Sequence, residues 1–191
     1  KNALNVACAV LFLLELGFDA EKVKKALINF SGAQRRFELV AHIGNNLLFD
    51  DYAHHPEEID ATIHAFRTGF PSYRLVLIFQ PHTYSRTLSL KTEFAESLTH
   101  ADLTIITDIF PSAREQKDQF SITSADIATE AHSHDKKNII FQPKKDVIPF
   151  LEKNIRQGDI SCTMGAGDIY TLKNDIIRLM NDRNSHDLER I

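Results

Sequence analysis

The sequence predicts an α/β protein whose main domain is a doubly wound, mostly parallel sheet with an antiparallel hairpin at its edge. Apolar strand-like runs alternate with helical segments from residue 74 onward, and this order requires right-handed crossovers between parallel strands. Two further strand-like runs, 37–43 and 47–53, flank Gly44-Asn45-Asn46, a hairpin-type connection. An antiparallel hairpin is a common variation at the edge of such a sheet.

The first 36 residues predict a separate helical unit. Residues 2–16 are almost continuously apolar, which favours a mostly buried helix that ends at Gly17. Asp19 is placed to cap a second helix over residues 20–30. Since residues 31–36 (SGAQRR) predict a loop, we expect a domain boundary after residue 36.

The main domain is expected over residues 37–181. Its first helix, 56–68, begins with Pro56 followed by two acidic residues, as helix N-termini often do. The last ten residues, 182–191, have almost no apolar content and predict a disordered tail. The other expected strands are 74–80, 102–110, 138–143 and 159–165, and the other expected helices are 88–101, 124–133, 144–156 and 168–181.

Composition excludes several classes of protein. The 191 residues are 43% hydrophobic and 25% charged, which is typical of a soluble globular domain. The net charge of −4, without a basic tract, argues against a nucleic-acid partner. No run reaches the ~18 apolar residues of a membrane helix, so no membrane partner is expected. Cys8 and Cys162 each lie in an apolar run, so we expect two buried, reduced thiols. We also expect the chain to be a piece of a longer cytoplasmic protein.

Polar and ionisable residues are concentrated directly after the predicted strands. Ligands of open parallel sheets bind beyond the carboxyl ends of the strands, so this concentration predicts a functional site at that edge. The residues concerned are Asp51, Tyr52, His54 and His55, then His82, Ser85 and Arg86, then Asp108, Arg114 and Glu115, and finally Gly165, Gly167 and Asp168.

The first of these segments is DDYAHHPEE, residues 50–58. Asp51 can accept hydrogen bonds from a ribose diol, and His54 and His55 can bind an anion together with the helix amides that follow. The alternative is a solvated loop in which one histidine caps the helix. A metal site is not expected, because these residues lack the i, i+4 spacing of a helical ligand pair and the chain has no CxxC or HExxH.

The second segment is HTYSRT, residues 82–87, in which Arg86 can hold a carboxylate with two parallel hydrogen bonds. Alternatively, Arg86 pairs with a neighbouring surface acid. In GAGD, residues 165–168, the glycines allow a close backbone approach and Asp168 is expected to cap a helix. No GxxxxGK[S/T] occurs in the chain, so we expect no cradle for nucleotide phosphates.

Taken together, these segments resemble the C-terminal domain of the Mur ligase family, in its branch of UDP-N-acetylmuramate–L-alanine ligases. DDYAHHPEEIDATI and FQPHTYSRT are similar to the family's DDYAHHPTEI and FQPHRYSRT, and DIFPSARE and MGAGDIY resemble two further family segments. KNALN and FSGAQRRFE resemble the end of the family's central ATP-binding domain and its linker. The resemblance covers about residues 1–180 and implies a Rossmann-like Mur ligase C-terminal domain at 37–181 preceded by the helical end of the central domain at 1–36.

This resemblance implies part of a cytoplasmic, ATP-dependent enzyme of peptidoglycan precursor synthesis. Such an enzyme joins L-alanine to the carboxylate of UDP-N-acetylmuramate through an acyl phosphate, using ATP and Mg²⁺. The missing N-terminal and central domains of the same enzyme would be partners of this chain, and the central domain would hold most of the ATP and Mg²⁺. The chain alone is therefore expected to be inactive.

The resemblance also implies roles for eight residues. The expected catalytic residues are His54, His82 and Arg36; the substrate-binding residues are Tyr52, Ser85 and Arg86; the nucleotide-binding residues are Asn5 and Asp51. Arg86 would bind the carboxylate of the amino acid, and Arg36 would reach the ATP phosphates. Lys1 and Thr83 depart from the family pattern, in which a histidine and often an arginine stand. Alternative functions are a ligase that recycles the UDP-N-acetylmuramate tripeptide, a non-catalytic nucleotide- or amino-acid-binding module of the same fold, and a metal-dependent hydrolase.

Overall fold

The computed structural model describes residues 2–30, 32–115 and 117–188. The chain divides into two compact units, one ending at Arg36 and one beginning at Phe37. In the part of the chain that the structure describes, no helix is long and apolar enough to cross a membrane.

The N-terminal unit consists of two helices, α1 (Asn2–Glu15) and α2 (Ala20–Ile28). Asp19 caps α2 as predicted, since its carboxylate accepts a hydrogen bond of 3.0 Å from the amide of Lys22. That this unit is the end of a longer central domain stays a prediction.

The prediction that the first helix is buried is wrong for this unit. Leu11 and Phe12 are 63% and 64% exposed, and Cys8, expected to be buried, is also exposed. An all-round apolar helix can be covered only by several neighbouring elements, and within its own unit α1 has one neighbouring helix. Cys162, by contrast, is fully buried, as expected.

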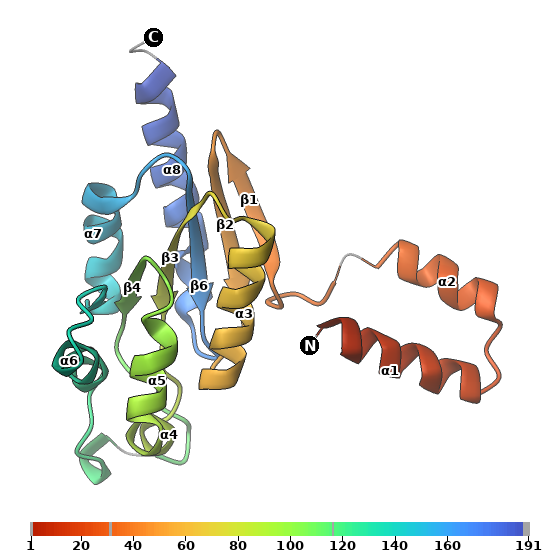
Figure 1. Ribbon diagram of the computed structural model, residues 1–191, viewed down its shortest axis with the longest axis horizontal. Coiled ribbons are helices and arrows are strands. Elements are labelled where there is room, and N and C mark those ends of the chain that lie inside the picture. The colour runs from red at the N-terminus through yellow and green to blue at the C-terminus, as the bar shows by residue number, and fades with distance from the viewer. Residues whose placement is uncertain (1, 31, 116, 189–191) are drawn as a thin grey trace. The chain divides into compact units, whose positions relative to one another are not determined.

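The second unit is built on a six-stranded sheet in the order β1-β2-β6-β3-β4-β5 (Figure 1). The first two strands pair antiparallel and every other neighbouring pair is parallel. The predicted fold class, a mostly parallel doubly wound sheet with an antiparallel edge hairpin, is confirmed. The strands are β1 (Glu38–Ile43), β2 (Asn46–Asp51), β3 (Arg74–Phe79), β4 (Leu103–Ile106), β5 (Ile139–Phe141) and β6 (Asp159–Met164).

Helices cover both faces of this sheet, each over its own apolar core (Figure 1). Helices α3 (Pro56–Gly69), α5 (Lys91–Leu98) and α6 (Ser124–Ser133) pack on one face, and α7 (Val147–Asn154) and α8 (Lys173–Leu188) pack on the other. The remaining elements are α4 (Tyr84–Ser89) and the 3₁₀ turns η1 (Lys117–Gln119), η2 (Lys144–Asp146) and η3 (Ile169–Leu172).

Aromatic packing holds the first residue of this unit in place. The ring of Phe37 lies 5.0 Å from that of Phe49 and 4.5 Å from that of Phe66, measured between centroids. Phe70 lies 5.7 Å from Phe49 and closes the cluster. Such pairs stabilise beyond the area they bury, so the chain is anchored at the point where the second unit begins.

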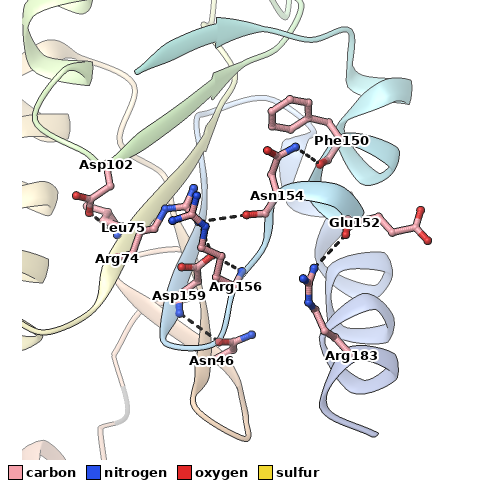
Figure 2. Close-up of polar contacts among 10 residues, drawn as sticks. All are labelled: Asn46, Arg74, Leu75, Asp102, Phe150, Glu152, Asn154, Arg156, Asp159 and Arg183. Atoms are coloured by element: carbon pink, nitrogen blue, oxygen red, sulfur yellow. Dashed lines mark hydrogen bonds and ion pairs between the residues drawn. The ribbon is translucent and has the colours of Figure 1, made fainter. Parts of the chain in front are cut away.

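A polar cluster fixes the opposite, amino-terminal edge of the sheet (Figure 2). The buried carboxylate of Asp159 accepts hydrogen bonds from the Arg74 guanidinium at 3.0 Å and from the Arg156 amide at 2.8 Å. The amide of Asp159 in turn donates to the side chain of Asn46 at 3.2 Å. Burial raises the pKa of Asp159 against the opposing influence of the Arg156 amide and the charge of Arg74. These contacts join the starts of β2, β3 and β6, the strands whose far ends carry the candidate site.

Three segments differ from the sequence prediction. The expected helix over 88–101 is two helices, α4 and α5, which meet at Leu90, a residue with φ −118° and ψ 25° outside the helical region. Helix α4 also begins at Tyr84, inside the expected loop. Helix α8 continues to Leu188 through most of the expected tail, and residues 189–191 lie outside the described residues.

Candidate active site at the carboxyl ends of the strands

The strand order reverses where β6 enters the sheet. The crossovers from β2 to β3 and from β4 to β5 carry α3 and α6 on one face, and the chain then returns through α7 on the other. Strand β6 consequently lies between β2 and β3. The chain leaves β2 and β3 towards helices on one face of the sheet, whereas it leaves β6 towards α8 on the other face. Open α/β sheets bind ligands at this kind of switch, beyond the carboxyl ends of the strands.

Strand β2 ends on Asp51, whose side chain is almost completely buried. One carboxylate oxygen accepts a hydrogen bond of 2.8 Å from the amide of Phe37, and the other accepts one of 2.7 Å from the amide of Ala53. The carboxylate thus ties the strand end to the first residue of the second unit.

His54 follows three residues after this carboxylate. Its Nδ1 lies 2.9 Å from the carbonyl oxygen of Tyr52, and its amide donates to the carboxylate of Glu58 at 3.1 Å. A carbonyl oxygen only accepts, so this contact favours the tautomer with the proton on Nδ1 and makes Nε2 the acceptor nitrogen of the neutral ring. His55 stands at the N-cap of α3 but makes no capping hydrogen bond through its side chain, so it does not cap this helix.

His82 lies beyond the end of β3, across from His54. Their ring centroids are 6.3 Å apart, and His82 stacks on Phe110 at 5.9 Å with an interplanar angle of 17°. Burial lowers the pKa of His82, and the positive charges of Arg86 and His54 lower it further, while Glu115 opposes them. A neutral His82 is therefore favoured near pH 7.

Ser85 and Arg86 lie in the first turn of α4. The Arg86 guanidinium donates to the carbonyl of His82 at 3.4 Å, which connects the two residues across one helical turn. The amide of Ser85 donates to the carboxylate of Glu115 at 3.1 Å, and its hydroxyl donates to the same oxygen. Ser85 is thus bound within the protein, and its predicted contact with substrate stays a prediction.

The GAGD turn after β6 brings two loops together. A Cβ on Gly165, where φ is +141°, would lie 2.5 Å from the backbone oxygen of Gln80, so the close approach requires glycine. Asp168 stands at the N-cap position of η3, but its side chain makes no capping hydrogen bond, so the predicted side-chain cap is wrong. Its carboxylate accepts from the Gln80 side chain at 2.9 Å and pairs with Lys144 at 2.7 Å, because the turn directs it across the sheet edge.

The predicted site residues therefore fall into two sets. Those in the second unit lie at one edge of the sheet: Asp51, Tyr52, His54, His82, Ser85 and Arg86. Asn5 and Arg36 lie in the N-terminal unit, where both are exposed. No group of three His, Cys, Asp or Glu side chains is arranged to hold a metal ion within 2–30, 32–115 and 117–188.

Sequence reasoning did not give roles to two residues that contact this site, Phe110 and Glu115. Both belong to DIFPSARE, which spans the end of the expected strand 102–110 and the residues after it, so their edge of the sheet was predictable. Their contacts with residues 82–86 span about thirty positions of the chain, and no pattern within either segment indicates them.

Comparison with known proteins identifies the family. Residues 35–167 match the family model described as "Mur ligase, glutamate ligase domain". A UDP-N-acetylmuramate–L-alanine ligase of Lachnospira eligens is 39% identical over 177 residues, which are 93% of this chain and 38% of that protein. The crystal structure of a UDP-N-acetylmuramate–alanine ligase from Thermotoga maritima superposes with a TM-score of 0.72 at 30% identity, over 95% of this chain and 38% of that one.

The chain is therefore an α/β protein with a doubly wound sheet, and its polar residues lie at the carboxyl ends of the strands, where domains of this class bind ligands. The chain belongs to the Mur ligase family. It spans about two fifths of the length of the curated relatives that it matches. A murein peptide ligase structure from Psychrobacter arcticus, at 23% identity and a TM-score of 0.67, shares the fold.

Proposed function

We propose that this chain is the C-terminal part of an ATP-dependent ligase that joins L-alanine to the carboxylate of UDP-N-acetylmuramate. The observation that carries this proposal is its similarity, along 93% of the chain, to a relative with that name. The gathering of Tyr52, His54, His82 and Arg86 around the ends of β2 and β3 supports it, since an amide-forming site must bind a carboxylate and accept a proton.

Arg86 is proposed to bind the carboxylate of L-alanine. A guanidinium can donate two parallel hydrogen bonds to a carboxylate, and Arg86 is only half-buried at the start of α4. Such a clamp leaves the amine of the amino acid directed towards the other polar residues of the edge.

His82 and His54 are proposed to accept and hold the proton that the attacking amine must lose. An ammonium group has no lone pair with which to attack a carbonyl, so the amine has to be neutral. The lowered pKa of His82 keeps its ring neutral and able to accept near pH 7. Tyr52 contacts His54 edge-on at 5.3 Å and is proposed to limit its rotation.

The nucleotide is proposed to be shared with the remainder of the longer protein. ATP with Mg²⁺ would activate the muramate carboxylate as an acyl phosphate. From this chain, Asn5 is proposed to contact the adenine, Asp51 the ribose, and Arg36 the phosphates. The position of the Asp51 carboxylate at the end of β2 supports the ribose contact, because carboxylates accept hydrogen bonds from hydroxyl groups.

The longer protein is proposed to be a cytoplasmic enzyme of peptidoglycan precursor synthesis. Residues 1–36 are proposed to form the end of its central domain. The present chain by itself should release no phosphate from ATP and should show no micromolar ATP binding by calorimetry. Micromolar binding by this chain would contradict the proposed division of the nucleotide site.

Arg86→Ala in the full-length protein tests the amino-acid site. Two hydrogen bonds to a charged group contribute about 3 kcal/mol in total, so the KM for L-alanine should rise on the order of a hundredfold. The KM for ATP should change little. Arg67→Ala is the matched control, because Arg67 pairs with Asp102 at the amino-terminal edge of the sheet. Equal effects of Arg86→Ala on both substrates would remove Arg86 from this role.

The tripeptide-recycling ligase is the second candidate, and the amine substrate distinguishes the two. A full-length protein that ligates free L-alanine but not the tripeptide supports the first candidate. The reverse preference supports the second, in which the same edge of the sheet would accommodate a larger amine.

A further inference from the structure

We propose that Glu115 is the positioning residue of the amino-acid site: its carboxylate fixes the start of α4 and thereby the placement of Arg86 and His82. This inference rests on the proposed function and extends it to a residue outside the two polar segments that follow β2 and β3. Its contacts, rather than any motif, point to the role.

The start of α4 lacks the usual cap. Thr83 occupies the N-cap position with φ +72°, a left-handed conformation, and its side chain makes no capping hydrogen bond. The first amides of a helix have no partner within the helix and need an acceptor from elsewhere. Left-handed backbone is unfavourable for a β-branched residue, so this conformation persists only where neighbouring contacts hold it.

Glu115 supplies the missing acceptor. Its carboxylate accepts hydrogen bonds from the amide of Tyr84 at 2.8 Å and from the amide and hydroxyl of Ser85. Burial raises the pKa of this carboxyl, but the hydrogen bonds from Ser85 and Tyr84 outweigh that influence and lower it overall. The group is therefore ionised at neutral pH, and charge-assisted bonds of this kind are stronger than neutral ones.

The segment that carries Glu115 holds the same loop at a second place. The amide of Thr83 donates to the carbonyl of Phe110 at 2.9 Å, and the amide of Phe110 donates to the carbonyl of Pro81 at 2.8 Å. The ring of Phe110 stacks under that of His82. The segment after β4 therefore holds residues 81–85 at both ends. Phe110 contacts residues 81–83, and Glu115 contacts residues 84 and 85.

Arg86 depends on this support because it is the next residue along. Its guanidinium donates to the carbonyl of His82 across the turn that Glu115 fixes. Without the Glu115 carboxylate, the amides of Tyr84 and Ser85 lose their acceptor, and the turn that carries both Arg86 and His82 can shift. A displacement of about 1 Å of a positioning group can lower turnover a hundredfold.

Glu115→Gln in the full-length protein tests the proposal. A glutamine offers one acceptor oxygen and one amino group, so it cannot accept from the Tyr84 amide and both Ser85 groups. The KM for L-alanine should rise by about tenfold to a hundredfold, while the KM for ATP stays within about twofold. Glu115→Asp keeps the charge but withdraws it by one methylene, and it should act in the same direction.

Asp102→Asn is the matched control. The Asp102 carboxylate also accepts from a backbone amide, that of Leu75 at 2.7 Å, at the opposite edge of the sheet (Figure 2). It accepts a second hydrogen bond from the Arg67 guanidinium. This variant should lose stability without changing the KM for L-alanine. A melting curve of each variant separates loss of fold from loss of positioning.

Three outcomes overturn the positioning role: an unchanged KM for L-alanine in Glu115→Gln, an equal rise for both substrates, or failure of both Glu115 variants to fold. The last would make Glu115 a stability residue. A wild-type full-length protein that forms no product with L-alanine overturns the proposed function itself. If the wild-type protein ligates L-alanine and Glu115→Gln has an unchanged KM for L-alanine, only the inference about Glu115 is overturned.

Discussion

Asp51→Asn should destabilise the fold as well as any nucleotide contact, because the carboxylate has a structural task that its position at a strand end does not reveal. Its two oxygens accept from the amides of Phe37 and Ala53 at 2.8 and 2.7 Å. Asparagine keeps one acceptor oxygen and presents an amino group where the second amide needs an acceptor. One bond becomes neutral and the other is replaced by two opposed donors.

The expected cost follows from these two bonds. A hydrogen bond to a charged group contributes about 1.5–3 kcal/mol, and a buried donor left without an acceptor costs about 1–3 kcal/mol. The loss should therefore be about 3 kcal/mol. At a urea dependence of about 2 kcal/mol per molar, the unfolding midpoint should fall by about 1.5 M with an unchanged slope.

Urea unfolding of the chain, followed by circular dichroism, measures this change. Asp108→Asn serves as the control, since Asp108 is exposed and accepts a bond of 3.1 Å from the amide of Lys144. Its cost should stay below about 1 kcal/mol. If Asp51→Asn is as mild as Asp108→Asn, the anchoring of Phe37 through Asp51 is refuted.

Three further changes should have separable effects. Phe66→Ala opens a cavity under the aromatic cluster and should cost about 3–5 kcal/mol in urea unfolding, with a smaller loss refuting close packing there. Gly167→Ala places a Cβ 2.3 Å from the Gln80 side chain and 2.7 Å from Phe110, so it should cost about 1–3 kcal/mol of stability. In the full-length protein it should also raise the KM for the proposed substrate L-alanine, whereas wild-type stability would contradict the close approach. Burial raises the pKa of Asp102, but the hydrogen bonds from Arg67 and from the Leu75 amide outweigh this and lower the pKa overall. The stability contributed by ionised Asp102 is therefore complete above the ordinary carboxyl pKa and is lost as the pH falls through the lowered pKa. The stability difference between wild type and Asp102→Asn should therefore shrink on acidification, and a constant difference would argue against an ionised Asp102.

The fold and the edge that carries the site were predictable for one physical reason. The apolar runs identify the strands, and the carboxyl ends of parallel strands lie at one edge, so the polar segments after them must gather there. The hairpin was predictable because Gly44, with φ +56°, is the residue such a turn requires. These are local properties of a few neighbouring residues.

The predictions for Asp168 and for the start of α4 were wrong because contacts between residues distant in the chain decide the structure there. Asp168 was expected to cap a helix, but the reach of Lys144 and Gln80 across the sheet edge determines its partners. Helix α4 starts earlier than its pattern indicates because Glu115, thirty-one residues ahead in the chain, binds its first amide. Propensity favours or disfavours a helix start only weakly, and a well-placed acceptor outweighs it.

By itself, the sequence of this Mur ligase family member determined the alternation of strands and helices, and the motifs DDYAHHPEE and HTYSRT that follow two of the strands. Only the tertiary structure decided how those motifs are held: Asp51 by Phe37, the first residue of the second unit, His82 by the ring of Phe110, and the start of α4 by Glu115. The physical reason is that periodicity and spacing report which face or edge a residue occupies. Hydrogen bonds additionally require donor and acceptor within about 3 Å, and that distance is set by packing across the whole sheet.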